Sequence, residues 1–291
     1  MNWIQGIQAA IDYVEENIRD DIDFEKVAKR AYSSSFHFQR VFSILCGFSL
    51  GDYIRMRRLS LAGEELSKGN AKIIDIALKY GYESPESFSR AFTKFHGISP
   101  KEAKKSGNVK IFTPLSVKLI LTGGSKMNYR IEKRDSFQIV CKRKKVEKPM
   151  SGSGSEEINK MWKECSQDGS LNKLVSYIPQ NSAMNGLLGI CFTSELVSDN
   201  FSYGIGVEYD GRKVDDNLEI VTIPKNTYAV FTAKGKMPDA FIETYKRIVT
   251  EFFPQSTQYE YASNVEFEVY YSDDILNPNY ECEIWIAVNE K

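Results

Sequence analysis

Apolar residues recur every three or four positions through the first hundred residues, which is the spacing of an amphipathic helix; the first stripe runs from Ile4 to Ile18. Side chains that cap helix N-termini predict where later helices begin, and Gly47 and Gly69 predict where two of them end. We therefore expect residues 1–108 to be all-α. The predicted capping residues are Asp23, Ser49, Ser84 and Ser99, the last two followed by proline.

Part of this helical segment occurs twice. VAKRAYSSSFHFQRVFSILCGFS from Val27 aligns with IALKYGYESPESFSRAFTKFHGIS from Ile76, and Arg40 corresponds to Arg90. The pattern predicts two helix-turn-helix motifs, at about 23–46 and 72–97. The second helix of such a motif enters the major groove, so two copies in one chain can read an asymmetric DNA site. The alternative is a helical repeat whose polar face is merely solvated.

From residue 127 the hydrophobic pattern changes to a period of two, which is typical of strands. The order strand, helix, strand, strand occurs twice and predicts an α+β domain over 127–291, built from duplicated β-α-β-β units. We expect SGSGS at 151–155 to be a loop within this domain, with Ser155 capping the helix that follows. Residues 109–126 are expected to be a linker that contains one short strand and a flexible exit.

Composition narrows the classes of function. The chain has 291 residues, 42% of them hydrophobic, enough for two domains. Its apolar runs are shorter than the ~20 residues of a membrane span, and MNWIQGIQAA lacks the order of a signal peptide, so a cytoplasmic protein with no membrane partner is expected. Only two histidines and five scattered cysteines occur, which favours reduced thiols and argues against a metal site or a nucleophile-His-acid triad. No cofactor is expected.

The net charge of -1 hides two opposed regions. Residues 1–148 carry a net charge of +10, and residues 149–291 carry -11. This separation suggests an anionic partner for the first region and a cationic partner for the second. Ordinary solvated surface charge is the alternative.

The strand VEFEVYY indicates what a cationic partner would meet. A period of two places Glu266, Glu268 and Tyr270 on one face of the strand, and Phe267 among the core residues on the other. A glutamate among aromatic rings suits a bulky, weakly hydrated cation, because the carboxylate neutralises the charge and the rings attract it. An exposed carboxylate and ordinary core aromatics are the alternative.

The first half resembles the DNA-binding domain of the AraC/XylS transcription regulators. The carriers of this resemblance are FHFQRVF, the turn Gly47-Phe48-Ser49 and KIIDIALKYGYESPESFSRAFTKFHGISP. It implies a double-stranded DNA partner with an asymmetric promoter site, and RNA polymerase as a further partner. Arginine suits guanine and glutamine suits adenine at base edges. The DNA-binding residues implied are Phe36, Gln39 and Arg40 in the first motif, and Glu86, Ser87 and Arg90 in the second.

The second half resembles the gyrase-inhibitor-like (GyrI-like) effector-binding domain of regulators that respond to organic cations and drugs. The carriers are MNYRIEKRDSFQIV, FSYGIGVEY, IPKNTYAVFTAKG, EFEVYYSDD and EIWIAV. The resemblance implies Glu268 as the counter-ion of a cationic ligand. The expected aromatic walls of the site are Trp162, Tyr203, Tyr228, Tyr270 and Trp285.

Together these patterns predict a one-component bacterial transcription regulator. An all-α double helix-turn-helix domain (1–108) and a linker (109–126) precede an α+β effector-binding domain (127–291) for a small cationic or amphipathic effector. Ligand binding would change promoter occupancy or polymerase contact, and activation and repression both stay open. Two alternatives are a small-molecule hydrolase that uses Glu268 and Tyr270, and a domain that binds another protein or no ligand.

Overall fold

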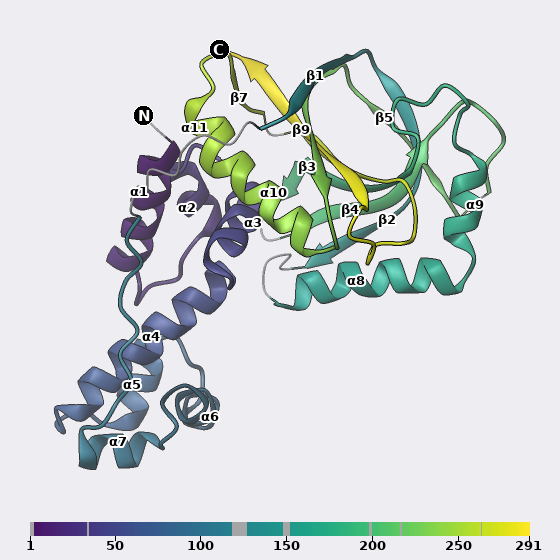
Figure 1. The fold of residues 1–291 in the computed structure, drawn as a ribbon. Helices are drawn as coiled ribbons and strands as arrows, with labels where there is room; N and C mark the ends of the chain where they lie inside the picture. The colour runs from purple at the N-terminus through teal and green to yellow at the C-terminus, as the bar shows by residue number, and fades with distance from the viewer. Residues whose placement is uncertain are drawn as a thin grey trace. The chain divides into compact units, whose positions relative to one another are not determined.

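The fold is described from a computed structural model, which describes residues 3–33, 35–117, 127–147, 152–197, 200–215, 217–262 and 264–291 (Figure 1). The chain divides into two compact units. Unit 1 comprises Met1–Tyr32 and Phe48–Ile120, and unit 2 comprises Ser33–Gly47 and Leu121–Lys291. The division differs from the predicted domains because residues 33–47 group with unit 2.

Unit 1 is helical, as its periodicity predicts, and the predicted caps are present. Asp23, Ser49 and Ser84 each accept a backbone N–H bond at a helix start, and Ser99 forms a reciprocal capping box with Glu102. The helices are α1 (Trp3–Glu16), α2 (Phe24–Arg30), α4 (Leu50–Ser67), α5 (Ile73–Lys79), α6 (Pro85–His96) and α7 (Pro100–Ser106).

The second helix-turn-helix motif has its own core, in which Phe88 and Phe92 are fully buried. His96 belongs to this core. Its Nε2 donates to the Leu59 carbonyl at 3.0 Å, and its Nδ1 accepts from the Lys110 amide at 3.0 Å. Both ring nitrogens are therefore occupied, and burial lowers the pKa of this imidazole. His96 has a structural role.

The first part of the predicted linker belongs to unit 1. Residues 109–117 form no strand, so the strand expected here is wrong as far as residue 117. Four of their backbone N–H groups bond to side chains of α1, α4 and α6. Residues 118–126 lie outside the described part of the chain. The bonds run from Lys110 to His96, Phe112 to Ser60, Leu115 to Tyr53 and Val117 to Gln8.

Unit 2 contains an antiparallel sheet and helices. The strands are β1 (Tyr129–Arg134), β2 (Phe137–Glu147), β3 (Leu187–Val197), β4 (Asn200–Glu208), β5 (Glu219–Ile223), β6 (Asn226–Lys234), β7 (Tyr259–Tyr261), β8 (Val265–Tyr270) and β9 (Glu281–Glu290). The helices are α3 (Ser35–Cys46), α8 (Gly152–Gln167), α9 (Ser170–Ser176), α10 (Asp239–Arg247), η1 (Ile248–Phe252) and α11 (Phe253–Gln255). Because α8 begins at Gly152, the expected loop with a cap at Ser155 is wrong.

The sheet confirms the duplication. Its strand order is β1-β6-β9-β8-β3-β4-β2-β5, with β7 added beside β9. Strands β2, β3 and β4 follow the same chain order and spatial order as strands β6, β8 and β9. A crossover helix follows the first strand of each set, α8 after β2 and α10 after β6. The two sets meet where β3 pairs antiparallel with β8. This seam lies at the centre of the sheet.

The two faces of the sheet differ in what covers them. One face holds an apolar core that includes Phe267, Leu188 and Ile190. On the opposite face, α8 packs through Met161 and Cys165 against β2, β3 and β4, and α3 contacts both α10 and β3. The second face therefore brings three helices to the seam.

In the described residues, no helix combines the length and apolar character needed to cross a membrane. The same residues contain no group of three or more His, Cys, Asp or Glu side chains placed to hold a metal ion. The five cysteines have free thiols; Cys46 is half-buried and the others are buried.

Candidate cation site and DNA-contact helices

Glu268 lies on β8 at the seam, opposite Gly189 of β3. A Cβ atom at position 189 would come within 2.9 Å of Glu268 Oε2 and 2.5 Å of the Tyr203 hydroxyl. Any larger residue here would therefore have to displace one or both of these functional groups. The seam thus places a carboxylate and a phenol beside each other.

Aromatic side chains from three elements surround this carboxylate. The Tyr270 hydroxyl donates to Glu268 Oε2 at 2.8 Å, and Trp162 Nε1 of α8 donates to the Tyr203 hydroxyl at 2.9 Å. The Trp162 and Tyr270 rings meet edge to face at 5.4 Å. Four of the six predicted ligand-binding residues therefore come together.

A cationic group of the chain itself occupies the site. Arg40 of α3 places Nη2 2.5 Å from Glu268 Oε1 and Nη1 3.6 Å from Glu266 Oε2. Its guanidinium carbon lies 4.7 Å from the centre of the Tyr245 ring and 5.3 Å from that of Phe241, both on α10. We call Arg40, Trp162, Tyr203, Tyr245, Glu268 and Tyr270 the Glu268 cluster.

A second acidic group lies beside this cluster and binds the same helix. Glu266 is 2% exposed; its Oε1 accepts from the Tyr261 hydroxyl at 2.9 Å and lies 3.5 Å from His37 Nδ1. The His37 ring stacks on Tyr261 at 3.6 Å. Two residues of α3, His37 and Arg40, are thus held by two glutamates of β8.

Burial and charge set the ionisation of these groups. Burial opposes the charge of Arg40, but Glu268 and its neighbours outweigh burial and raise its pKa well above the ordinary value. Burial and then Glu268 raise the pKa of both Tyr203 and Tyr270 well above theirs, so both phenols are neutral at pH 7. Burial disfavours charged Glu266, but bonds and charges from His37, Arg40 and Tyr261 lower its pKa.

Trp285 and Tyr228 are not part of the cluster, which corrects the expected aromatic wall. Cross-strand partners share one face of a sheet, and Trp285 pairs with Phe267 whereas Glu268 pairs with Ile284. Trp285 therefore faces the apolar core, where its ring meets Tyr228 at 5.8 Å. Its Nε1 donates to Glu283 at 2.9 Å.

The predicted DNA-contact residues differ between the two motifs. On α6, Glu86 and Arg90 are exposed, whereas Ser87, which the pattern places among the exposed positions, is half-buried. On α3, Gln39 is 4% and Arg40 8% exposed, so the expected exposure of this face is wrong. The cause is the packing of α3 against α10 and β3 within unit 2. The side chain of Phe36 lies outside the described part.

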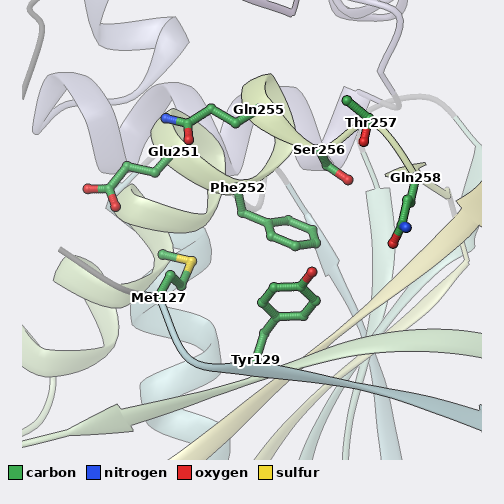
Figure 2. Close-up of a pocket in the computed structure, with 8 residues that line it drawn as sticks. All are labelled: Met127, Tyr129, Glu251, Phe252, Gln255, Ser256, Thr257 and Gln258. Carbon is green, nitrogen blue, oxygen red and sulfur yellow. The ribbon is translucent and has the colours of Figure 1, made fainter. Parts of the chain in front are cut away.

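A separate pocket of ≈ 290 Å³ opens beside β1 and α11 (Figure 2). Its carboxylate, Glu251, forms an ion pair with Arg247 at 3.0 Å, and its Phe252 and Tyr129 rings pack edge to face at 4.7 Å. None of the predicted site residues lines this pocket. We therefore place the candidate site at Glu268.

The opposed charges of the sequence are partly paired in unit 2. The basic residues of β1 and β2 form ion pairs with acidic residues from later in the chain, which accounts for part of the basic excess before residue 149. The pairs are Arg130–Glu283, Arg134–Glu208, Lys142–Asp168 and Arg143–Glu219.

Two helix-turn-helix sequences and a duplicated sheet with a half-buried, ion-paired carboxylate at its seam define a DNA-binding regulator with an effector domain. Residues 130–288 match the family model described as integron-associated effector binding protein, and residues 27–106 match a helix-turn-helix domain. The chain belongs to the integron-associated, GyrI-like effector-binding family, and its helix-turn-helix domain is of the AraC type. It is thus an AraC-family DNA-binding transcription regulator.

Three similar proteins each match one part of the chain. MarA of Escherichia coli, a multiple antibiotic resistance protein, is 31% identical over 113 residues, which are 38% of this chain and 89% of MarA. The transcriptional activator AarP of Providencia stuartii is 38% identical over 32% of this chain and 70% of AarP. The structure of SAV2435 bound to tetraphenylphosphonium is 25% identical, with a TM-score of 0.49, over 56% of this chain and 94% of that chain.

Proposed function

We propose that unit 2 binds a bulky organic cation on Glu268 and that this binding controls how the chain acts at a promoter. One observation supports the proposal most strongly: the Glu268 cluster holds a guanidinium between a carboxylate and aromatic rings. Arg40 lies 2.5 Å from Glu268 and 4.7 Å from the Tyr245 ring centre. The chemistry required to bind a cation is therefore present.

The cluster favours a weakly hydrated organic cation. Each ring that faces such a cation contributes about 0.5–2 kcal/mol to its binding. The desolvation cost of the carboxylate is offset only when a cation pairs with it. The neighbouring phenols of Tyr203 and Tyr270 are neutral, so they add hydrogen bonds without adding charge. Glu268 also accepts bonds from both Arg40 and Tyr270, which occupy the oxygens that a general base would need free.

At the promoter we propose that α6 reads base edges through Glu86, Ser87 and Arg90, and that α3 does so through Phe36, Gln39 and Arg40 when its polar face is exposed. Arginine can donate two bonds to guanine, and two recognition helices in one chain suit an asymmetric site. Effector binding then alters DNA occupancy or contact with RNA polymerase.

A thermal-shift titration with tetraphenylphosphonium tests the cation site. Its charge is surrounded by four phenyl rings, which suits this cluster. A ligand at 100 times its dissociation constant stabilises the folded state by about 2.7 kcal/mol, so the melting temperature of the wild type should rise. Glu268→Gln should lose this rise because it removes the counter-ion while keeping the shape.

Glu283→Gln is the matched control. Glu283 is another strand carboxylate of similar side-chain exposure to Glu268, paired with Arg130 at 2.6 Å and with the Trp285 N–H, but its partners lie away from the Glu268 cluster. This variant should keep the cation-induced rise. An equal rise in wild type and Glu268→Gln, or no rise with any of a panel of lipophilic cations, would contradict the proposal.

A further inference from the structure

We propose that Arg40 is an internal ligand of the cation site, so that an effector binds by replacing it and thereby frees helix α3 for DNA. The proposal deepens the proposed function, on which it rests, by stating how the same site is regulated. It follows from the contacts of Arg40, from the repeat that contains this residue, and from the groups that hold α3.

The contacts of Arg40 are those that an effector would make. Its charge is 2.5 Å from Glu268, its planar group lies over Tyr245, and the residue is 8% exposed. An effector that pairs with Glu268 between these rings must take the position that the guanidinium occupies. Arg40 and a cationic effector are therefore competitors for one carboxylate.

The repeat shows a second use for this residue. Arg40 corresponds to Arg90, which is exposed on α6. An arginine at this position of a recognition helix can bind guanine through its fork of N–H donors. Arg40 cannot bind Glu268 and a base edge at the same time. While Arg40 is bound in the cation site, α3 therefore cannot contact a base through this residue.

The other polar contacts of α3 have no equivalents in the sequence of α6. His37, which lies 3.5 Å from Glu266 and stacks on Tyr261, corresponds to Ser87 in the repeat. The sequence therefore specialises the first recognition helix, and not the second, for contact with the acidic strand β8.

Competition has a thermodynamic consequence. If the site accepts an effector only when Arg40 has left, the apparent affinity for the effector is reduced by the fraction of molecules in which Arg40 has left. By linkage, the effector increases the population in which α3 is available, and DNA that engages α3 strengthens effector binding. Removing the internal ligand should therefore strengthen cation binding.

The experiment is isothermal titration of full-length protein with tetraphenylphosphonium. Arg40→Met keeps the apolar stem and removes the charge, and we expect it to bind the cation about tenfold more tightly than the wild type, within the range typical of coupled sites. Arg90→Met is the matched control, because it makes the same change at the equivalent exposed position, and its affinity should equal that of the wild type.

The outcomes separate this inference from the proposed function. Equal or weaker binding by Arg40→Met, in a chain whose wild type binds the cation, overturns the internal ligand but leaves the cation site intact. No binding by either protein overturns the cation site. Binding by Arg40→Met alone supports both proposals. If Arg40→Met does not fold, Arg40→Lys, which lacks the planar fork, should bind more tightly than the wild type by a smaller factor, and unchanged binding would overturn the inference.

Discussion

Helices α3 and α6 occupy equivalent positions in a repeat, yet their polar faces meet different surroundings. Arg90 of α6 is exposed, whereas Arg40 of α3 is buried between Glu268 and the rings of α10. The apolar pattern is shared, since Phe42 corresponds to Phe92 and both are buried. A shared apolar pattern therefore specifies a helix in both places. What the equivalent arginine contacts depends on the acidic groups that a distant part of the chain supplies.

The largest expected effect is on the stability of unit 2. Breaking a buried ion pair from one side costs about 3–5 kcal/mol, so Arg40→Met should destabilise unit 2 by that order, whereas the exposed Arg90→Met should cost less than about 0.5 kcal/mol. Urea unfolding in a Trp3→Phe background, in which Trp162 and Trp285 of unit 2 are the remaining tryptophans, measures the difference by fluorescence. The double variant Arg40→Met/Glu268→Gln should lose less than the sum of the two single changes. Equal losses of unfolding free energy in Arg40→Met and Arg90→Met would contradict the proposed difference between the two arginines.

A smaller effect is expected on DNA affinity. On a duplex that the wild type selects from a random pool, Arg90→Ala should weaken binding by about 1–3 kcal/mol, the worth of one bidentate base contact. Without a cation, Arg40→Ala should have little effect on DNA affinity, because Arg40 is engaged with Glu268 and does not contact DNA. After a cation is added, the same change should weaken DNA binding. Fluorescence anisotropy at fixed salt tests both, and an equal loss for the two variants without a cation would contradict the proposed roles.

The cap of α6 gives a prediction confined to the second motif. Ser84→Ala removes the oxygen that accepts the Ser87 N–H at 3.1 Å and should cost about 1 kcal/mol of unit 1 stability. Ser84→Asp, which keeps a capping oxygen, is the control and should restore most of it. Cation affinity should not change in either variant, and a change would show that the second motif also acts on the cation site.

The mildest effect is a pH dependence that appears only in acid. The folded-state pKa of Glu266 is lowered, so its stabilisation is complete above the ordinary glutamate value of about 4.3 and is lost as the pH falls toward the folded-state pKa. Unit 2 should therefore lose stability below about pH 4 more steeply in the wild type than in Glu266→Gln. Parallel curves from urea unfolding between pH 3 and pH 7 would show that Glu266 does not hold α3 as a charged group.

Much of the fold could be predicted from the sequence because its signals are local. The caps at Asp23, Ser49, Ser84 and Ser99 fix helix starts within four residues of themselves, and alternation identifies most strands of the sheet. Glu268, Tyr270, Tyr203 and Trp162, which the sequence pattern assigns to one ligand site, lie close together, and their role in binding a ligand stays a prediction. The short elements α9 and β7 were missed, since neither is long enough to show a clear period.

Two features of the site could not be predicted from local patterns. The face that Trp285 takes depends on the register of β9 against β8, which the long connection between these strands leaves open in the sequence. The partner of Arg40 lies 228 residues further along the chain. The sequence carried only an indirect signal for it, the acidic charge of the second half, which indicated a cationic partner without showing that the chain supplies one itself.

The central claim is that a cation frees α3 and leaves α6 unchanged. Hydrogen exchange of the full-length protein, read by mass spectrometry on peptides covering Ser35–Cys46 and Pro85–His96, tests it directly. With saturating tetraphenylphosphonium, exchange in the α3 peptide should become faster while the α6 peptide stays unchanged, and Glu268→Gln should show no response to the cation in either peptide. Slower or unchanged exchange in the α3 peptide of a wild type that binds the cation would contradict the account.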